Sequence, residues 1–219
     1  MGEYQYFEFA AIDRPLTAAE QRELRRVSTR GEISATSFVN EYEWGDFKGD
    51  PNVWMARYFD AHLYYANWGF RHVALRLPLS VLDPATAARY CRGEAATSWA
   101  TTTHVIVDLA IDDEEGDYDE FDPEDWLSEI TPVRTELAAG DFRSLYLGWL
   151  RVVQERALDG AELEPPVPAG LGGLTAAQRA LVDFLRIDAD LLRAAAQGDD
   201  QTAAPRLRAV RELLAAESA

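Results

Sequence analysis

The chain of 219 residues has few of the residue types that build disulfides and metal sites. Its single cysteine, Cys91, cannot form an internal disulfide, and a lone thiol is typical of a reducing compartment. Its three histidines, His62, His72 and His104, stand in no H-x-H or H-E-x-x-H pattern, so the spacing indicates no metal site. We expect paired core or surface histidines, with His72 and His104 able to meet across a sheet.

Long apolar runs and familiar catalytic motifs are also missing. No stretch is apolar for long enough to cross a bilayer, and Glu3 and Glu8 interrupt what would be the apolar part of a signal peptide. Neither a phosphate-binding loop nor a G-x-S-x-G nucleophile turn is present. We therefore expect a cytoplasmic protein that binds no membrane, and no motif assigns it a cofactor or a reaction.

Basic residues are scarce relative to acidic ones. The chain has 38 acids against 21 bases, a net charge of −17, and Lys48 is its one lysine. Such a charge opposes binding to nucleic acid and favours solubility or a basic protein partner. The acids concentrate between Asp108 and Glu129, where no lysine or arginine occurs: Asp108, Asp112, Asp113, Glu114, Glu115, Asp117, Asp119, Glu120, Asp122, Glu124, Asp125 and Glu129.

This acidic run allows two interpretations. It can be a solvated loop that ends in a helix cap, or else a functional surface: a docking surface for a basic protein or an imitation of a nucleic-acid phosphate track. A calcium loop does not fit: in the register that starts at Asp112 the glycine falls fifth, and in the register that starts at Asp117 the sixth residue is Asp122. The residues that we predict to contact a basic partner are Asp112, Asp113, Glu114, Glu115, Asp117 and Asp119.

Hydrophobic periodicity predicts an α+β fold. Residues 4–12, 33–42, 70–77 and 102–111 have the pattern of strands, and residues 17–29 and 51–68 that of helices. We predict a mixed four-stranded sheet with packed helices in residues 1–121. An all-helical region, 122–219, follows as a separate domain or packed on the first as one globule. Within the helix 51–68, the side chains expected to be buried are Trp54, Phe59, Leu63 and Tyr65.

The segment WGDFKGDP, residues 44–51, is the other candidate site. Its glycines allow the backbone to approach a ligand, and its aromatic and charged side chains lie close together. The alternative is structural: Asp50 caps a helix, the glycines form a turn and the aromatic rings anchor the loop. The candidate ligand-binding residues are Trp44, Asp46, Lys48 and Asp50.

Two smaller features also have a structural explanation. Asp13 and Arg14 can form a functional ion pair or simply part of a turn before Pro15. Cys91 beside Arg92 can be an activated thiol, but no neighbouring histidine supports a nucleophile. A buried, inert thiol is the expectation.

Several segments together resemble a family of conserved bacterial proteins for which no activity is established. They are YFEFAAIDRPLT at 6–17, FVNEYEWGDFKGDP at 38–51, YFDAHLYYANWG at 58–69, LEPPVPAGLGGLTAAQ at 163–178 and FLRIDADLL at 184–192. The resemblance extends from about residue 4 to residue 196 and implies a bacterial source. It implies no catalytic residue.

Two function classes follow from these patterns. The first is a non-enzymatic interaction protein that presents an acidic surface and an aromatic loop to a protein partner. The second is an enzyme or small-ligand-binding protein that uses the loop at 44–51. We favour the first, because active sites usually leave a recognisable group of polar residues.

Overall fold

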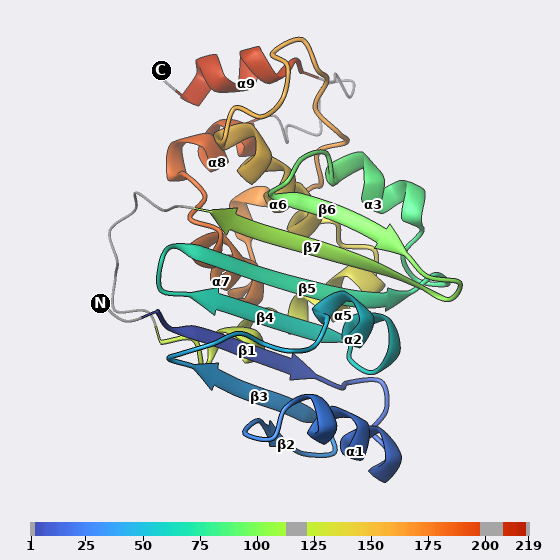
Figure 1. Ribbon diagram of the computed structural model, residues 1–219. Coiled ribbons are helices and arrows are strands. Elements are labelled where there is room, and N and C mark those ends of the chain that lie inside the picture. The colour runs from blue at the N-terminus through green and yellow to red at the C-terminus, as the bar shows by residue number, and fades with distance from the viewer. Residues whose placement is uncertain (1–2, 113–121, 198–207, 218–219) are drawn as a thin grey trace.

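The computed structural model describes residues 3–112, 122–197 and 208–217 (Figure 1). Its strands form one seven-stranded sheet in the order β2-β3-β1-β4-β5-β7-β6, and every strand pair is antiparallel. The α+β class is therefore confirmed, but the prediction of a mixed four-stranded sheet is wrong. The strands are β1 (Gln5–Ala10), β2 (Glu32–Ile33), β3 (Ser37–Tyr42), β4 (Ala61–Ala66), β5 (Phe70–Pro78), β6 (Ala96–Ala100) and β7 (His104–Asp112).

Alternating side chains explain how the central strands divide the core into two clusters. In β5, Val73, Leu75 and Leu77 point to one face, while Ala74 contributes to the cluster on the other. A side-chain period of two residues sends successive positions to opposite faces of a sheet. Both faces of the sheet are covered, so these strands bury apolar residues on both sides.

The predicted helix 51–68 is wrong beyond its first half. Helix α2 spans Pro51–Arg57, and the chain then forms strand β4 (Ala61–Ala66). Because β4 is central, its successive residues are buried on both faces, and its run of apolar and aromatic side chains also fits a broad helical stripe. Gly69, expected to end the helix, instead has φ of 101° in the turn from β4 to β5, a conformation that favours glycine.

Two short strands escaped prediction for local reasons. Strand β2 has only two residues. The turn between β2 and β3 is stabilised by the Ser34 hydroxyl, which accepts hydrogen bonds from the Thr36 and Ser37 backbone amides at 3.1 and 2.9 Å. Strand β6 (Ala96–Ala100) has the sequence ATSWA, which shows little apolar alternation. Its pairing with β7 comes from tertiary contacts.

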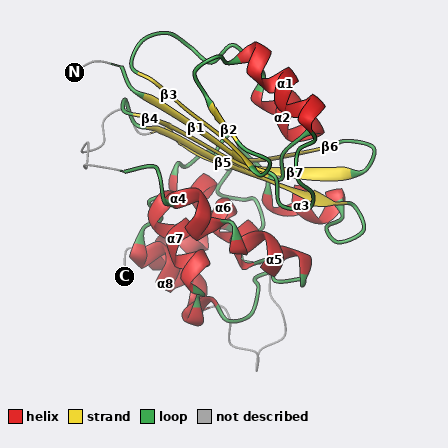
Figure 2. Cartoon of the chain, turned by 90° about the horizontal axis from the view of Figure 1, so that it is seen from below, coloured by secondary structure: helices red, strands yellow, loops and turns green. Residues whose placement is uncertain are grey.

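Helices α1 (Ala18–Val27) and α2 cover one face of the sheet, as the edge-on view in Figure 2 shows. A capping box begins α1: the Thr17 hydroxyl accepts from the Glu20 backbone amide, and the Glu20 carboxylate accepts from the Thr17 backbone amide. This face forms a cluster rich in aromatic rings: Phe7, Phe9, Ala11, Leu16, Leu24, Phe38, Trp54, Met55, Tyr58, Phe59, Ala74 and Ile106.

The remaining helices lie on the opposite face (Figures 1 and 2). The 12-residue α6 is buried over most of its length, which explains its dense apolar sequence. From residue 122 onward the described residues form helices and no strand, as predicted. The helices on this face are α3 (Pro84–Tyr90), which precedes residue 122, and α4 (Trp126–Ile130), α5 (Pro132–Ala138), α6 (Arg143–Gln154), α7 (Ala176–Phe184), α8 (Ala189–Ala196) and α9 (Val210–Glu217), with a 3₁₀ turn at Leu171–Gly173.

Buried charges join parts of the fold that are distant in sequence. Asp60 accepts from Arg76 at 2.7 Å and from the Ile12 and Asp13 amides at 2.7 and 2.9 Å. Arg134 of α5 donates to the Arg76 carbonyl at 2.7 Å and to the Asp13 carboxylate at 2.5 Å, so it links the helical layer to the sheet. Asp13 therefore pairs with Arg134, whereas Arg14 pairs with Glu20.

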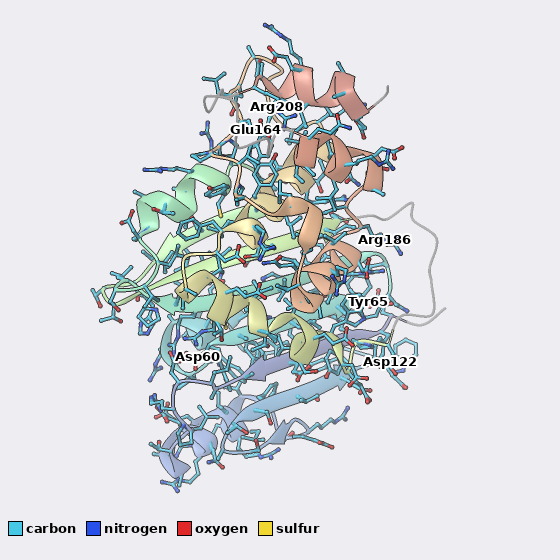
Figure 3. All side chains as sticks on the ribbon, turned by 180° about the vertical axis from the view of Figure 1, so that it is seen from behind. Asp60, Tyr65, Asp122, Glu164, Arg186 and Arg208 are labelled. Atoms are coloured by element: carbon cyan, nitrogen blue, oxygen red, sulfur yellow. The ribbon has the colours of Figure 1, made fainter. Side chains whose placement is uncertain are left out.

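A second buried carboxylate holds the proline-rich connector at 159–174. Glu164 is 1% exposed and accepts from Arg208 Nε and Nη2 at 2.8 and 3.0 Å (Figure 3). The Tyr146 hydroxyl also donates to Glu164, and Arg208 donates to the Ala194 carbonyl at the end of α8. The connector is thus fastened to α6 and α8, which gives this charge group a structural role.

Candidate functional site

The contacts of the WGDFKGDP loop, residues 44–51, are those of a structural turn that leads into α2. Asp50 caps α2 by accepting from the Asn52 and Val53 amides at 2.9 and 3.2 Å. Phe47 stacks on Phe7 with ring centroids 4.9 Å apart, so the loop is anchored to the aromatic cluster.

The four candidate ligand residues of this loop do not come together in either of the two pockets formed by the described residues. The Asp46 carboxylate accepts from the Gln5 side-chain Nε2 at 3.4 Å, and Lys48 is exposed. Asp50 contributes to a pocket of about 280 Å³ between α1 and α2, which Trp44 and Lys48 do not line. Trp44 is 79% exposed, the most exposed of the large apolar side chains in the described ranges. The loop therefore presents an aromatic ring to solvent, and of its four candidate residues only Asp50 lines either of the described pockets.

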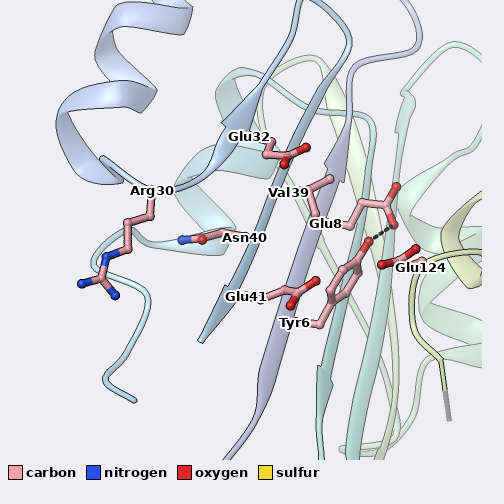
Figure 4. Close-up of a pocket in the computed structure, with 8 residues that line it drawn as sticks. All are labelled: Tyr6, Glu8, Arg30, Glu32, Val39, Asn40, Glu41 and Glu124. Carbon is pink, nitrogen blue, oxygen red and sulfur yellow. Dashed lines mark hydrogen bonds between the residues drawn. The ribbon is translucent and has the colours of Figure 1, made fainter. Parts of the chain in front are cut away.

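A larger pocket, of about 620 Å³, lies on the outer strands of the sheet. We call it the acidic groove. Its lining includes four carboxylates from three separate parts of the chain (Figure 4). The lining residues are Tyr6, Glu8, Arg30, Glu32, Val39, Asn40, Glu41 and Glu124.

Strand register places the groove side chains together. In the antiparallel pair of β1 and β3, Tyr6 lies opposite Glu41 and Glu8 lies opposite Val39. Directly opposed residues share a face, so all four belong to the face that carries the helical layer. That layer contacts β4, β5 and β6 through α4, α5 and α6 respectively. Glu41 is exposed and Glu8 is partly exposed, so the helices leave this part of the face accessible.

The carboxylates of the groove have no cationic partner among the residues that the structure describes. Glu8, Glu32, Glu41 and Glu124 form no ion pair with any residue that the structure describes. Arg30 is the basic residue of the lining, and its guanidinium points away from the carboxylates (Figure 4). The groove thus gathers negative charge that the described part of the chain does not neutralise.

The surroundings of Glu8 raise the pKa of its carboxyl group. Burial is the main cause, and the negative charges of Asp125 and Glu124 add to it. The Tyr6 hydroxyl opposes the shift by donating to Glu8 Oε2 at 3.0 Å. Burial, followed by the nearby carboxylates, raises the pKa of Tyr6 as well. Burial and the surrounding negative charge therefore shift the pKa values of Tyr6 and Glu8 in the same direction.

The acidic run contributes to this groove through its last residues. Glu124 lines the pocket, and the charge of Asp122 raises the pKa of the neighbouring Tyr4 after the larger effects of burial, Glu41 and Glu124. The predicted partner residue Asp112 ends β7. The other five, Asp113, Glu114, Glu115, Asp117 and Asp119, lie outside the described residues.

Asp108, at the start of the run, has a different environment. It projects from β7 and lies 2.6 Å from Nε2 of His72. The twelve acids therefore do not all belong to one surface. The partner of Asp108 is His72, which lies 36 residues away in the sequence and on a different strand.

The histidines are arranged differently from the prediction. His62 belongs to β4 and not to a helix, and its ring lies 5.2 Å from that of His72. His104 is paired with Pro78 in the sheet and its Nδ1 lies 2.7 Å from the Thr103 hydroxyl. The prediction that His72 and His104 meet across the sheet is therefore wrong. The two histidines that lie together are His62 and His72.

Cys91 has the properties expected of a structural thiol. Burial raises its pKa to about 11, with a smaller contribution from the negative charge of Asp108. A thiol with that pKa stays protonated near neutral pH, so it is a weak nucleophile.

No group of three or more His, Cys, Asp or Glu in the described ranges is arranged to hold a metal ion. None of the described helices is both long and apolar enough to cross a bilayer. Comparisons of the chain with protein-family models, curated proteins and solved structures find no match. The resemblance to a bacterial family therefore stays a prediction.

Sequence patterns contained a signal for the groove. Tyr6 and Glu8 alternate on β1, as Val39 and Glu41 do on β3, so strict alternation already placed each pair on a common face. What the sequence lacked was the pairing of these strands and the position of Glu124 beside them. The groove is consequently a product of tertiary structure.

Proposed function

We propose that this protein functions by binding a basic segment of a protein partner in the acidic groove, without catalysing a reaction on it. The observation that supports this proposal is the set of four carboxylates around a pocket of about 620 Å³ with no ion-pair partner in the described chain. Like charges held close together repel one another, and a bound cation relieves that repulsion. The groove is therefore better suited to a cationic group than to an anion.

Arginine side chains fit the groove particularly well. A guanidinium group donates paired hydrogen bonds to a carboxylate, and its aliphatic part packs on apolar surface. Tyr6 and Val39 supply such surface beside Glu8 and Glu41. We therefore expect arginine-containing peptides to bind more tightly than lysine-containing peptides of the same charge.

Trp44 extends the proposed interface. It follows the end of β3 and is three residues beyond Glu41 in the chain. Aromatic residues are enriched at protein interfaces because they bury a large area on contact. An exposed tryptophan next to an acidic strand suits a partner that combines basic and apolar side chains.

Binding to defined peptides tests the proposal. The probes are oligo-arginine, oligo-lysine and oligo-glutamate peptides, and the variant is Glu8→Gln combined with Glu41→Gln and Glu124→Gln. We expect the variant to bind oligo-arginine at least about tenfold more weakly than wild type, because three of the four carboxylates lose their charge. The difference should shrink as salt is added, since mobile ions screen charge over about 8 Å at 0.15 M.

Controls separate the groove from the acidic run and from net charge. Glu8→Gln and Glu94→Gln each remove one negative charge, but Glu94 is exposed near the far edge of the sheet. We expect Glu8→Gln to weaken binding of oligo-arginine and Glu94→Gln to leave it unchanged. A second variant replaces Asp112, Asp113, Glu114, Glu115, Asp117 and Asp119 by Asn or Gln. Loss of binding in that variant and not in the groove variant would assign the partner to the run and reject the groove.

A further inference from the structure

The outer edge of strand β3 is only partly covered by another strand. Strand β2 pairs with β3 at Phe38 and Val39, although β3 continues to Tyr42. Figure 1 shows β2 beside only part of β3. The last three residues of β3 therefore have no partner strand on this side among the residues that the structure describes.

The hydrogen-bond pattern shows which backbone groups of this edge are unused. The Ser37 carbonyl accepts from the Ser34 amide at 2.9 Å, on the β2 side of the strand. Alternate residues of an antiparallel strand direct their N–H and C=O groups to the same side, so Val39 and Glu41 also face outward. Glu32 of β2 is paired with Val39. No backbone group of the described residues bonds to the Glu41 amide or carbonyl on this side.

The end of α1 explains why β2 stops before it reaches this position. If β2 continued in register, Arg30 would lie opposite Glu41. Instead, the Gly31 amide donates to the Ser28 hydroxyl at 3.1 Å, and the Gly31 carbonyl accepts from the Arg25 guanidinium at 2.6 Å. These bonds hold Gly31 at the end of α1 and turn the chain away from β3. The acidic groove extends to this point, since residues from both sides of the gap line it.

We propose that the basic segment bound by the acidic groove adds to β3 as an extended strand that continues the line of β2. This inference rests on the proposed function and specifies the form of the partner. The outward amide and carbonyl of Glu41 supply the backbone hydrogen bonds. Unpaired backbone groups at a sheet edge are the usual template for such strand addition, and pockets beside the edge select the side chains.

The two faces of the sheet define the sequence of the added strand. A residue opposite Glu41 shares its face, which also carries Glu8 and Glu32, so that residue meets carboxylates. The next residue points to the other face, where the rings of Tyr42 and Phe7 have their centroids 5.8 Å apart. Apolar β-branched residues suit such a position in a strand. The partner is therefore an extended segment in which arginine alternates with valine, isoleucine or threonine.

Two peptides of equal composition test the added strand. In one, arginine alternates with valine, and in the other the same residues form an arginine block followed by a valine block. Binding of each to the full-length protein is measured by fluorescence anisotropy at low salt. We expect the alternating peptide to bind at least about tenfold more tightly, because only alternation brings successive arginines to the carboxylates while the backbone pairs with β3.

Substitution of Glu41 separates backbone pairing from charge. Glu41→Gln and Glu41→Pro both remove the carboxylate, but only proline removes the outward amide, at a strand edge where proline is tolerated. We expect Glu41→Pro to bind the alternating peptide at least about threefold more weakly than Glu41→Gln, the effect of one lost hydrogen bond. In the wild-type protein, exchange of the Glu41 amide hydrogen with water, followed by NMR, should slow when the peptide binds.

Modified peptides provide the matched control. Methylation of the backbone nitrogens of the arginines removes the N–H groups that face β3, so it should weaken binding, whereas methylation at the valines should not. Equal binding of the alternating and block peptides, with unchanged exchange at Glu41 and weaker binding in Glu8→Gln, would overturn the added strand and leave the groove as the site. No binding of either peptide by folded wild-type protein at low salt would overturn both proposals.

Discussion

At the scale of single residues, two partly or fully buried carboxylates behave in opposite ways. Burial acts to raise the pKa of Asp60, but hydrogen bonds from the Asp13 and Ile12 amides and from Arg76 outweigh it and lower that pKa. Burial raises the pKa of Glu8, and nearby acids reinforce the effect. The first group is therefore built to be charged, and the second is charged at a cost to stability.

Replacing Glu8 by Gln should stabilise the protein at pH 7. The folded chain holds the Glu8 proton more tightly than the unfolded chain does, where the pKa is about 4.3. The destabilisation consequently develops as pH rises above that value and is absent well below it. Urea denaturation should show a higher midpoint for the variant at pH 7 and no difference near pH 3. An unchanged or lower midpoint at pH 7 would show that the negative charge of Glu8 does not destabilise the folded protein.

Replacing Arg76 by Met should have the opposite effect. The variant removes the nearer cation of Asp60, whose side chain is 1% exposed, and leaves Arg134 at 4.0 Å. Breaking a buried ion pair in this way typically costs about 3–5 kcal/mol. Interactions of the ionised Asp60 carboxylate stabilise the fold and lower its pKa. This stabilisation is complete above the unfolded pKa of about 3.9 and is lost as pH falls below that value.

Arg57→Met is the comparison for Arg76→Met. Arg57 is 59% exposed and lies 3.6 Å from Glu23, so its ion pair should contribute less than about 1 kcal/mol. The measurement is the free energy of unfolding in urea between pH 3 and pH 7. Similar losses for the two variants would contradict a structural role for the buried pair.

At the scale of elements, prediction succeeded where local chemistry decides the structure. Thr17 and Asp50 begin helices because their side chains accept from free backbone amides, and this requires no distant partner. Strands β1, β3, β5 and β7 were located for a similar reason, since their alternation or β-branched content is visible locally. Strand β4 was missed because it is buried on both faces, and β6 because its pairing partner lies beyond its own sequence.

Phe59 tests the corrected boundary between α2 and β4. It is fully buried in the aromatic cluster, with its ring 5.1 Å from Phe9, so Phe59→Ala should cost about 3–5 kcal/mol. Val53→Ala, at a position of α2 that is 44% exposed, should cost less than about 1 kcal/mol. Chemical denaturation measures both. Equal costs would place Phe59 at the periphery of the fold.

At the scale of the whole molecule, the sheet and the C-terminal helices share one apolar cluster. It contains Leu75 and Val107 of the sheet together with Trp149 and Phe184 of the helices, and Arg134 adds a polar link between the layers. We therefore predict a single cooperative unfolding transition. Far-ultraviolet circular dichroism and tryptophan fluorescence should give coincident midpoints in urea. Two separated midpoints would show that residues 122–219 unfold as a domain of their own.

The candidate site depends on this larger scale more than the fold does. The acidic groove needs β1 beside β3 and Glu124 beside both, and the meeting of His62 with His72 likewise needs β4 beside β5. None of these pairings follows from spacing along the chain. The sequence showed how much negative charge the protein carries. The tertiary structure shows where part of it gathers with no ion-pair partner in the described ranges.

Localising a bound basic peptide by NMR is the most direct test of the central claim. Backbone amide shifts are recorded on wild-type protein during addition of an oligo-arginine peptide. We predict that the largest changes fall on Tyr6, Glu8, Glu41 and Glu124, that Glu94 is unaffected, and that added salt reverses the changes. Changes confined to other parts of the chain, or no change with a folded protein at low salt, would contradict the claim that the acidic groove binds a basic partner.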